Sequence, residues 1–219
     1  MDRRGFLKGA AVAAMGSGIP FGVRAETPAV RNGQVTYSRT FPVKIETDVM
    51  VCGGGPAGVA AAVAARAAGA RVFLAEAFTC FGGMGTAARV PVYMQFGDGI
   101  RPLAAGFGTR FRERLLKAGA ISSNYGSFDF EAVKREYDAV MVESGADFLF
   151  HTKVIDVIRE GDAIQYAICA SQSGIWAVKA KVYVDATGNG DVAVQSGVSF
   201  EKGDSMGKMM PASLLSSWI

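Results

Sequence analysis

The sequence predicts an α/β fold with three layers, in which helices cover one face of a parallel sheet and a small antiparallel meander covers the other. Two observations support this prediction. A strand–helix–strand pattern at residues 48–76 is typical of parallel pairing, and two later strand patterns are joined by a Gln-Ser-Gly turn. The chain has 219 residues, half of them apolar and 28 of them glycine, so it can bury one sizeable core.

The strand–helix–strand unit is the most informative segment. A short strand, Val43–Ile45, precedes it, and an apolar strand, Asp48–Cys52, then leads into a G-x-G-x-x-G spacing and an alanine-rich helix. A second strand, Arg71–Ala75, ends at Glu76. This order is typical of a Rossmann-like unit that binds a dinucleotide. The turn residues are Gly53, Gly55, Pro56, Ala57 and Gly58.

The chemistry of this turn suits a pyrophosphate. Glycines let the ligand approach the backbone, and the helix N-terminus offers unpaired N–H groups with partial positive charge. Glu76 is placed to accept a hydrogen bond from a ribose hydroxyl, and its charge would repel the 2′-phosphate of NADP. The alternative is an ordinary glycine-rich turn without a ligand.

The following elements complete the predicted layers. Residues 88–128 form an excursion that contains a loop and an amphipathic helix at 104–118. A second helix, 130–144, starts at an Asp129 N-cap. A strand pair lies within Asp147–Ile158. The final hairpin joins Ala163–Ser171 to Ile175–Val184.

A second glycine-rich turn follows the last of these strands, with the sequence VYVDATGNGD at residues 182–191. By itself it could be one more β–α connection with Asp191 as N-cap. Together with the first turn it resembles the FAD-dependent oxidoreductases of the glutathione-reductase-like fold, and more narrowly a bacterial family of them. The motifs shared with that family are GGGPAG (53–58), GGMGT (82–86), FDFE (128–131), ATGNGD (186–191) and GVSFEKG (197–203).

The resemblance implies a site for FAD built from backbone groups. The first turn and residues 186–188 would hold the pyrophosphate from two sides, and Glu76 would bind the adenosine ribose. The loop 82–86 would pass along the ribityl and flavin side, and Val154 would offer backbone contacts to adenine. The implied cofactor-binding residues are Gly53, Gly55, Pro56, Ala57, Gly58, Glu76, Gly82, Gly83, Met84, Thr86, Val154, Ala186, Thr187 and Gly188.

The N-terminus indicates export. Residues 3–8, RRGFLK, match a twin-arginine motif, a weakly apolar stretch follows, and residues 23–25 form a plausible cleavage site. We expect a signal peptide at 1–25, the twin-arginine machinery as partner, and a periplasmic or extracellular location. The apolar stretch is too short for a stable membrane span.

Charge and residue usage exclude several other classes. Residues 1–25 contain four basic residues and one acidic residue, which accounts for the whole net charge of +3, so nothing indicates nucleic acid. The three cysteines, Cys52, Cys80 and Cys169, show no metal spacing. Cys80 lies beside the 82–86 loop, but a buried inert thiol is the simpler interpretation.

No catalytic acid or base is identified, and the substrate is unknown. His151, the only histidine, is a better candidate for a strand residue near adenine than for a proton shuttle. Asp98 and Arg101 fit a surface turn better than a substrate site. We expect an FAD-dependent oxidoreductase or its N-terminal FAD-binding portion, spanning 26–219.

The resemblance also implies that the chain is truncated. Similar proteins continue well beyond the FEKG segment into a substrate domain that is largely absent here, and this chain ends in a strand pattern at Ser213–Ile219. The alternatives are an NAD-binding module and a non-catalytic flavoprotein remnant.

Overall fold

The computed structural model describes residues 30–31, 33–35, 37–90, 92–93, 97–98, 100–101, 105–122, 127 and 129–209. The expected signal peptide, 1–25, and the expected strand at 213–219 lie outside these residues. The chain divides into two compact units, Met1–Thr40 and Phe41–Ile219. In the first unit, β1 (Val30–Arg31) pairs antiparallel with β2 (Gln34–Val35).

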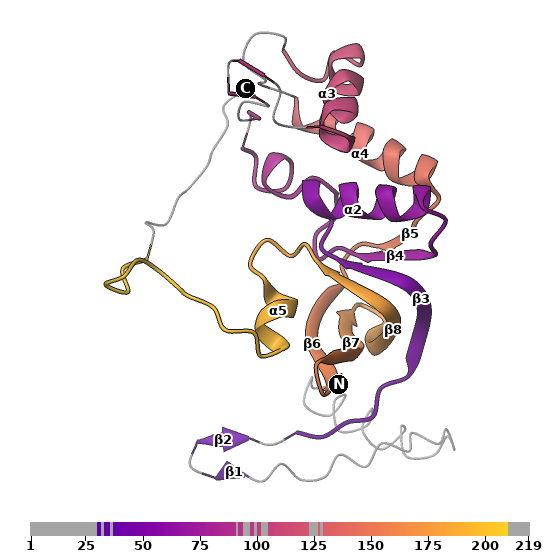
Figure 1. Cartoon of the computed structure of the whole chain (residues 1–219). Helices are drawn as coiled ribbons and strands as arrows, with labels where there is room; N and C mark the ends of the chain where they lie inside the picture. Colours follow the sequence, from indigo (N-terminus) through magenta and orange to yellow (C-terminus); the bar gives the residue numbers. More distant parts are fainter. Residues whose placement is uncertain are drawn as a thin grey trace, which may run out of the picture. The chain divides into compact units, whose positions relative to one another are not determined.

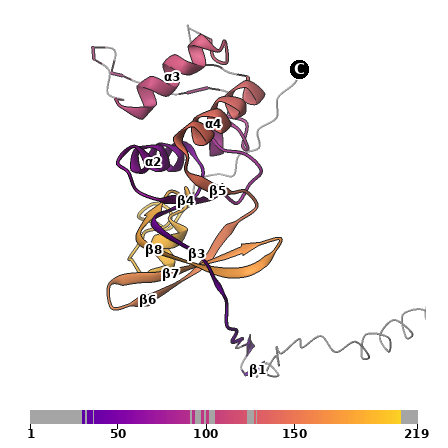
Figure 2. The ribbon, with the colours of Figure 1, turned by 90° about the vertical axis from the view of Figure 1, so that its right-hand side faces the viewer.

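The second unit contains a mixed sheet with the strand order β5-β4-β3-β8-β7-β6. Strands β5, β4, β3 and β8 are parallel to one another, whereas β7 is antiparallel to both β8 and β6. The long strand β8 therefore belongs to both the parallel part and the meander (Figure 2). The strands are β3 (Val43–Cys52), β4 (Val72–Ala75), β5 (Asp147–Leu149), β6 (Lys153–Glu160), β7 (Ala163–Ser171) and β8 (Gly174–Asp185).

Two details of the sheet differ from the sequence-based expectation. The short strand expected at Val43–Ile45 is the beginning of β3, because the pairing with β8 continues from Val43 to Cys52 across a bulge. The two strands within 147–158 are not partners. β5 pairs with β4, whereas β6 pairs with β7, so they lie at opposite ends of the strand order.

The helices of this unit are α2 (Pro56–Ala67), α3 (Phe107–Lys117), α4 (Phe130–Ser144) and α5 (Asp191–Gln195), with a 3₁₀ turn, η1 (Gly83–Gly85). The expected Asp129 cap is confirmed, since its carboxylate accepts hydrogen bonds from the N–H groups of Glu131 and Ala132. Helices α2, α3 and α4 lie on one side of the sheet, and α5 lies on the other with the meander (Figure 1).

Two hydrophobic cores confirm the three layers. Side chains of a strand alternate between its faces, so Val51 of β3 packs among the helices α2–α4, with Leu74, Phe111 and Tyr137. Met50 and Cys52 point the other way. They pack against the meander, with a buried group that contains Phe73, Val154, Val157, Cys169 and Trp176. The meander thus covers the face of the sheet that the helices leave uncovered. As a result, side chains of β6 and β4 share one hydrophobic core.

Candidate functional site

The two glycine-rich turns are in direct contact. They follow the adjacent parallel strands β3 and β8, in which Cys52 is the register partner of Asp185. The N–H of Ala186 donates to the carbonyl of Cys52 at 2.8 Å. Gly53 has φ +100°, and a Cβ there would lie 3.0 Å from the Cα of Thr187 and closer still to the backbone of Ala186. Only glycine fits this contact.

The start of α2 is open to an anion. Gly55 is the N-cap and Pro56 the first helical residue, with no side-chain cap and no acidic residue in the first turn. Gly58 is packed inside, because a Cβ there would collide with the carbonyl of Gly53, whereas a Cβ at Gly55 would meet nothing within 4 Å. The uncapped N–H groups and the positive end of the helix dipole therefore lie where a ligand can approach the backbone of Gly55 closely.

Glu76 is buried and already has two backbone partners. One carboxylate oxygen accepts a hydrogen bond from the N–H of Gly54, and the other accepts from the N–H of Phe78 at 2.7 Å. Each carboxylate oxygen can accept more than one bond. The carboxylate thus fixes the first turn to the end of β4, and its contact with a ribose stays a prediction.

The loop 82–86 packs on the first turn. The N–H of Gly82 donates to the carbonyl of Gly54 at 2.9 Å, and a Cβ on Gly83 would lie 3.3 Å from the Cα of Gly55. Met84 is largely exposed, whereas Thr86 is fully buried and its hydroxyl donates to the carbonyl of Phe81. The side chain of Thr86 therefore holds the shape of the loop.

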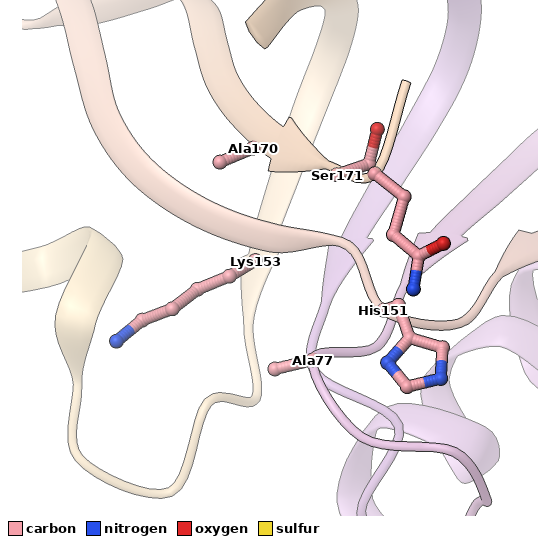
Figure 3. Close-up of a pocket in the computed structure, with 6 residues that line it drawn as sticks. Ala77, His151, Lys153, Ala170 and Ser171 are labelled. Atoms are coloured by element: carbon pink, nitrogen blue, oxygen red, sulfur yellow. The ribbon is translucent and has the colours of Figure 1, made fainter. Parts of the chain in front are cut away.

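The side chain of Val154 lies away from these turns, in the hydrophobic core between the sheet and the meander. Its strand begins beside the end of β4, because the N–H of Thr152 donates to the carbonyl of Glu76 at 2.9 Å and that of His151 donates to Phe78. An open depression of about 340 Å³ lies at this junction, with Ala77 and His151 in its lining (Figure 3).

Asp185 is a site residue that the sequence reasoning did not identify. Its Oδ1 accepts from the N–H and the hydroxyl of Thr187, and its Oδ2 accepts from the N–H of Ala193 at 2.9 Å. The Thr187 hydroxyl in turn accepts from the N–H of Asp191. The N-cap of α5 is Gly190, in a left-handed conformation, rather than Asp191. An aspartate two residues before a turn N–H is a local signal that would have indicated this role.

The hydrogen bonds and burial of Asp98, Cys52 and Cys169 indicate structural roles for these residues. Asp98 accepts hydrogen bonds from the N–H groups of Ile100 and Arg101, which lowers the pKa of its carboxyl and closes an exposed turn. Burial raises the pKa of Cys52, and it raises that of Cys169 to about 12. Within the described residues, no three His, Cys, Asp or Glu side chains gather as metal ligands, and no helix is long and apolar enough to cross a bilayer.

The fold and the paired turns define a dinucleotide-binding α/β domain of the Rossmann-like class, and the comparisons place it more narrowly. Residues 48–214 match the family model described as FAD dependent oxidoreductase. The chain belongs to this family. A search of curated proteins found no match.

The chain is also similar to several solved structures. THI4 from Thermovibrio ammonificans is 22% identical with a TM-score of 0.50, over 68% of this chain and 61% of that one. OxyS anhydrotetracycline hydroxylase from Streptomyces rimosus is 20% identical with a TM-score of 0.47, over 73% of this chain and 36% of that one. A geranylgeranyl bacteriochlorophyll reductase-like protein from Thermoplasma acidophilum is 22% identical with a TM-score of 0.45, over 70% of this chain and 42% of that one. The chain therefore spans less than two thirds of the length of each.

The family's cofactor is FAD, and the described residues fit it. Two backbone turns lie in contact where side chains would collide, and an uncapped helix start adjoins them. Backbone N–H groups and a helix dipole can hold two phosphates without a charged side chain.

Proposed function

We propose that this chain is the FAD-binding portion of an FAD-dependent oxidoreductase that passes electrons between a small-molecule substrate and the flavin. The observation that supports this most strongly is the contact between the turn at Gly53 and the turn at Ala186. Two backbone turns on adjacent parallel strands are suited to one diphosphate held between them, which is also the arrangement implied by the glutathione-reductase-like resemblance.

Each part of the proposed site has a separate task. The start of α2 binds the pyrophosphate with its N–H groups, and residues 186–188, held by Asp185, cover it. Glu76 orients the first turn through Gly54 and accepts a ribose hydroxyl. The exposed Met84 borders the ribityl and flavin side. When bound, FAD supplies a reversible two-electron acceptor.

The absorption spectrum of the purified chain tests this proposal. We expect yellow protein with the visible bands of a flavin, and release of FAD on denaturation. Anaerobic bleaching of those bands by candidate small-molecule reductants then tests oxidoreductase activity. Colourless protein whose melting temperature rises with NAD would favour an NAD-binding module, and colourless protein that responds to neither nucleotide would favour a remnant without cofactor.

We also propose that residues 1–25 direct export by the twin-arginine route to the periplasm or beyond. The support is the RRGFLK sequence and the segment that follows it. This route carries folded proteins, which suits one that binds its cofactor before export. A fusion of 1–25 to a reporter that works only after folded export should be active, and the fusion with both Arg3→Lys and Arg4→Lys should be inactive. Export of the double variant would contradict the proposal.

A further inference from the structure

The ring of Tyr137, in α4, is in contact with the start of the loop 82–86. Gly82 has φ +99°, and a Cβ there would lie 2.7 Å from Cε2 of Tyr137. Tyr137 is 1% exposed, and its ring packs on Phe111 with the two ring centroids 4.2 Å apart. The ring therefore has a fixed position against the backbone of Gly82.

The hydroxyl of Tyr137 contacts a second point on the same stretch of chain. Its oxygen lies 3.0 Å from the hydroxyl oxygen of Tyr93, and either group can donate the hydrogen bond. Burial raises the pKa of both tyrosines, so both hydroxyls keep their protons at neutral pH. Tyr137 thus contacts the chain with its ring at Gly82 and with its hydroxyl at Tyr93.

The backbone between these two contacts has a shape that its surroundings impose. The N–H of Val90 donates to the carbonyl of Met84 at 2.9 Å, which folds the chain back on the loop. Arg89 has φ +57°, a conformation that non-glycine residues rarely adopt. Such a conformation persists only where the surrounding structure determines it. The contacts of Tyr137 on both sides of the segment 82–90 are part of that structure.

We propose that Tyr137 is a positioning residue for the flavin side of the site, and that its hydrogen bond with Tyr93 holds the loop 82–86 in the shape that receives the cofactor. The inference rests on the proposed function, in which this loop passes along the ribityl chain and the flavin. Tyr137 is buried, so it acts through the backbone of Gly82. A loop that already has its bound shape binds more tightly, because ordering it costs no further free energy.

Binding of FAD and of ADP by variants of the full-length chain tests this role. Tyr93→Phe and Tyr137→Phe each remove one hydroxyl and keep the ring. In each variant FAD binding should weaken about fivefold, which corresponds to the net contribution of one hydrogen bond. ADP lacks the ribityl chain and the flavin, so its binding should equal that of the wild type. Tyr166→Phe, on β7, is the matched control and should bind both ligands as the wild type does.

The double variant Tyr93→Phe/Tyr137→Phe separates positioning from stability. Tyr93→Phe leaves the buried hydroxyl of Tyr137 without this partner, which should lower the melting temperature, whereas removal of both hydroxyls can be nearly neutral. We therefore expect the double variant to recover the melting temperature. Its FAD binding should stay as weak as in the single variants, because the hydrogen bond is still absent. With a purely structural role, FAD binding would recover together with stability.

Amide hydrogen exchange measures the loop in the chain without cofactor. The N–H of Ala88 donates to the carbonyl of Gly83 at 3.2 Å, and that of Val90 to Met84. Both amides should exchange faster in the double variant than in the wild type, because the segment opens more often when one of its attachments is lost. In Tyr166→Phe they should exchange as in the wild type. Unaltered exchange in the double variant would overturn the inference.

The outcomes distinguish this inference from the proposed function. If the wild type binds FAD and the single variants bind it equally well, the positioning role is wrong while the proposed function stands. The same holds if the variants weaken FAD and ADP alike, or if the double variant recovers FAD binding. If the wild type does not bind FAD, the proposed function fails and the inference fails with it.

Discussion

The backbone N–H of Gly54 donates a hydrogen bond to the buried carboxylate of Glu76, 22 residues later in the chain. This bond ties the first glycine-rich turn to the end of β4. The second oxygen of the carboxylate accepts from Phe78, so Glu76 fixes the backbone on both sides of the junction. Glu76, which we propose for ribose binding, therefore also stabilises the local backbone through these two hydrogen bonds.

The first prediction concerns this double role. Glu76→Gln replaces one acceptor oxygen with an NH₂ group that meets a backbone N–H. Leaving a buried donor unsatisfied costs about 1–3 kcal/mol. We expect the free energy of unfolding, measured by denaturant titration, to fall by that amount, and FAD affinity to fall with it. Glu160→Gln, an exposed glutamate at the end of β6, is the control and should change neither. Wild-type stability of Glu76→Gln would show that the Gly54 contact is unimportant.

The second prediction separates two kinds of glycine in one motif. Gly58→Ala should lower the free energy of unfolding by about 1–3 kcal/mol, because the new Cβ collides with the carbonyl of Gly53. Gly55→Ala should leave it nearly unchanged, since Gly55 has φ −65° and open space around it. We expect Gly55→Ala nevertheless to reduce FAD affinity about tenfold or more, because the methyl group occupies the approach of the pyrophosphate.

Denaturant unfolding and FAD titration of the two variants measure these effects. Gly69→Ala is unsuitable as a control because its φ is +85°. The surface variant Ala68→Gly, at the end of the same helix, is suitable and should keep FAD affinity. FAD binding by Gly55→Ala equal to the wild type would mean that the pyrophosphate does not approach the backbone there.

Local rules were enough to predict several elements. The cap at Asp129 depends on one side chain and the next few N–H groups, so the sequence specified it. The range 130–144 predicted for the second helix likewise agrees with α4, which spans Phe130–Ser144. Both features depend on residues close together in the chain.

Long-range features could not be predicted in this way. The strands β5 and β6 are consecutive in sequence, and only the fold of the meander over β4 shows that they pair with different neighbours. The partner of Glu76 became visible only when β3 and β4 placed Gly54 beside it. The buried hydroxyl of Thr86 likewise follows from packing, since its motif alone indicated a cofactor contact.

The third prediction tests Asp185, the organiser of the second turn. Asp185→Ala removes three hydrogen bonds, to Thr187 and to the N–H of Ala193. We expect faster amide hydrogen exchange confined to residues 186–197, a loss of about 1–3 kcal/mol in the free energy of unfolding, and weaker FAD binding. Asp162→Ala, in the exposed turn between β6 and β7, should leave exchange in that segment unchanged. Unaltered exchange in Asp185→Ala would contradict the assigned role.

The last prediction concerns the buried thiols of the meander core. Burial raises the pKa of Cys52 and that of Cys169, so both remain protonated in the folded chain when the pH rises to 9, the ordinary value of a thiol. Only the thiolate reacts with disulfide reagents. We therefore expect neither thiol to be modified in the native chain between pH 7 and 9, whereas the denatured chain should react up to about tenfold faster per pH unit.

The raised pKa also sets the direction of a stability change. The thiols contribute fully to stability below pH 9, and the contribution is lost as the pH rises further, because the unfolded chain then releases protons that the folded chain retains. Denaturant unfolding between pH 8 and 11 should show a steeper loss of stability in the wild type than in Cys52→Ala/Cys169→Ala. The double variant should be less stable at pH 8, since it leaves a cavity. Equal slopes in the two proteins would mean that water reaches these thiols and that the core between β3 and β7 is open.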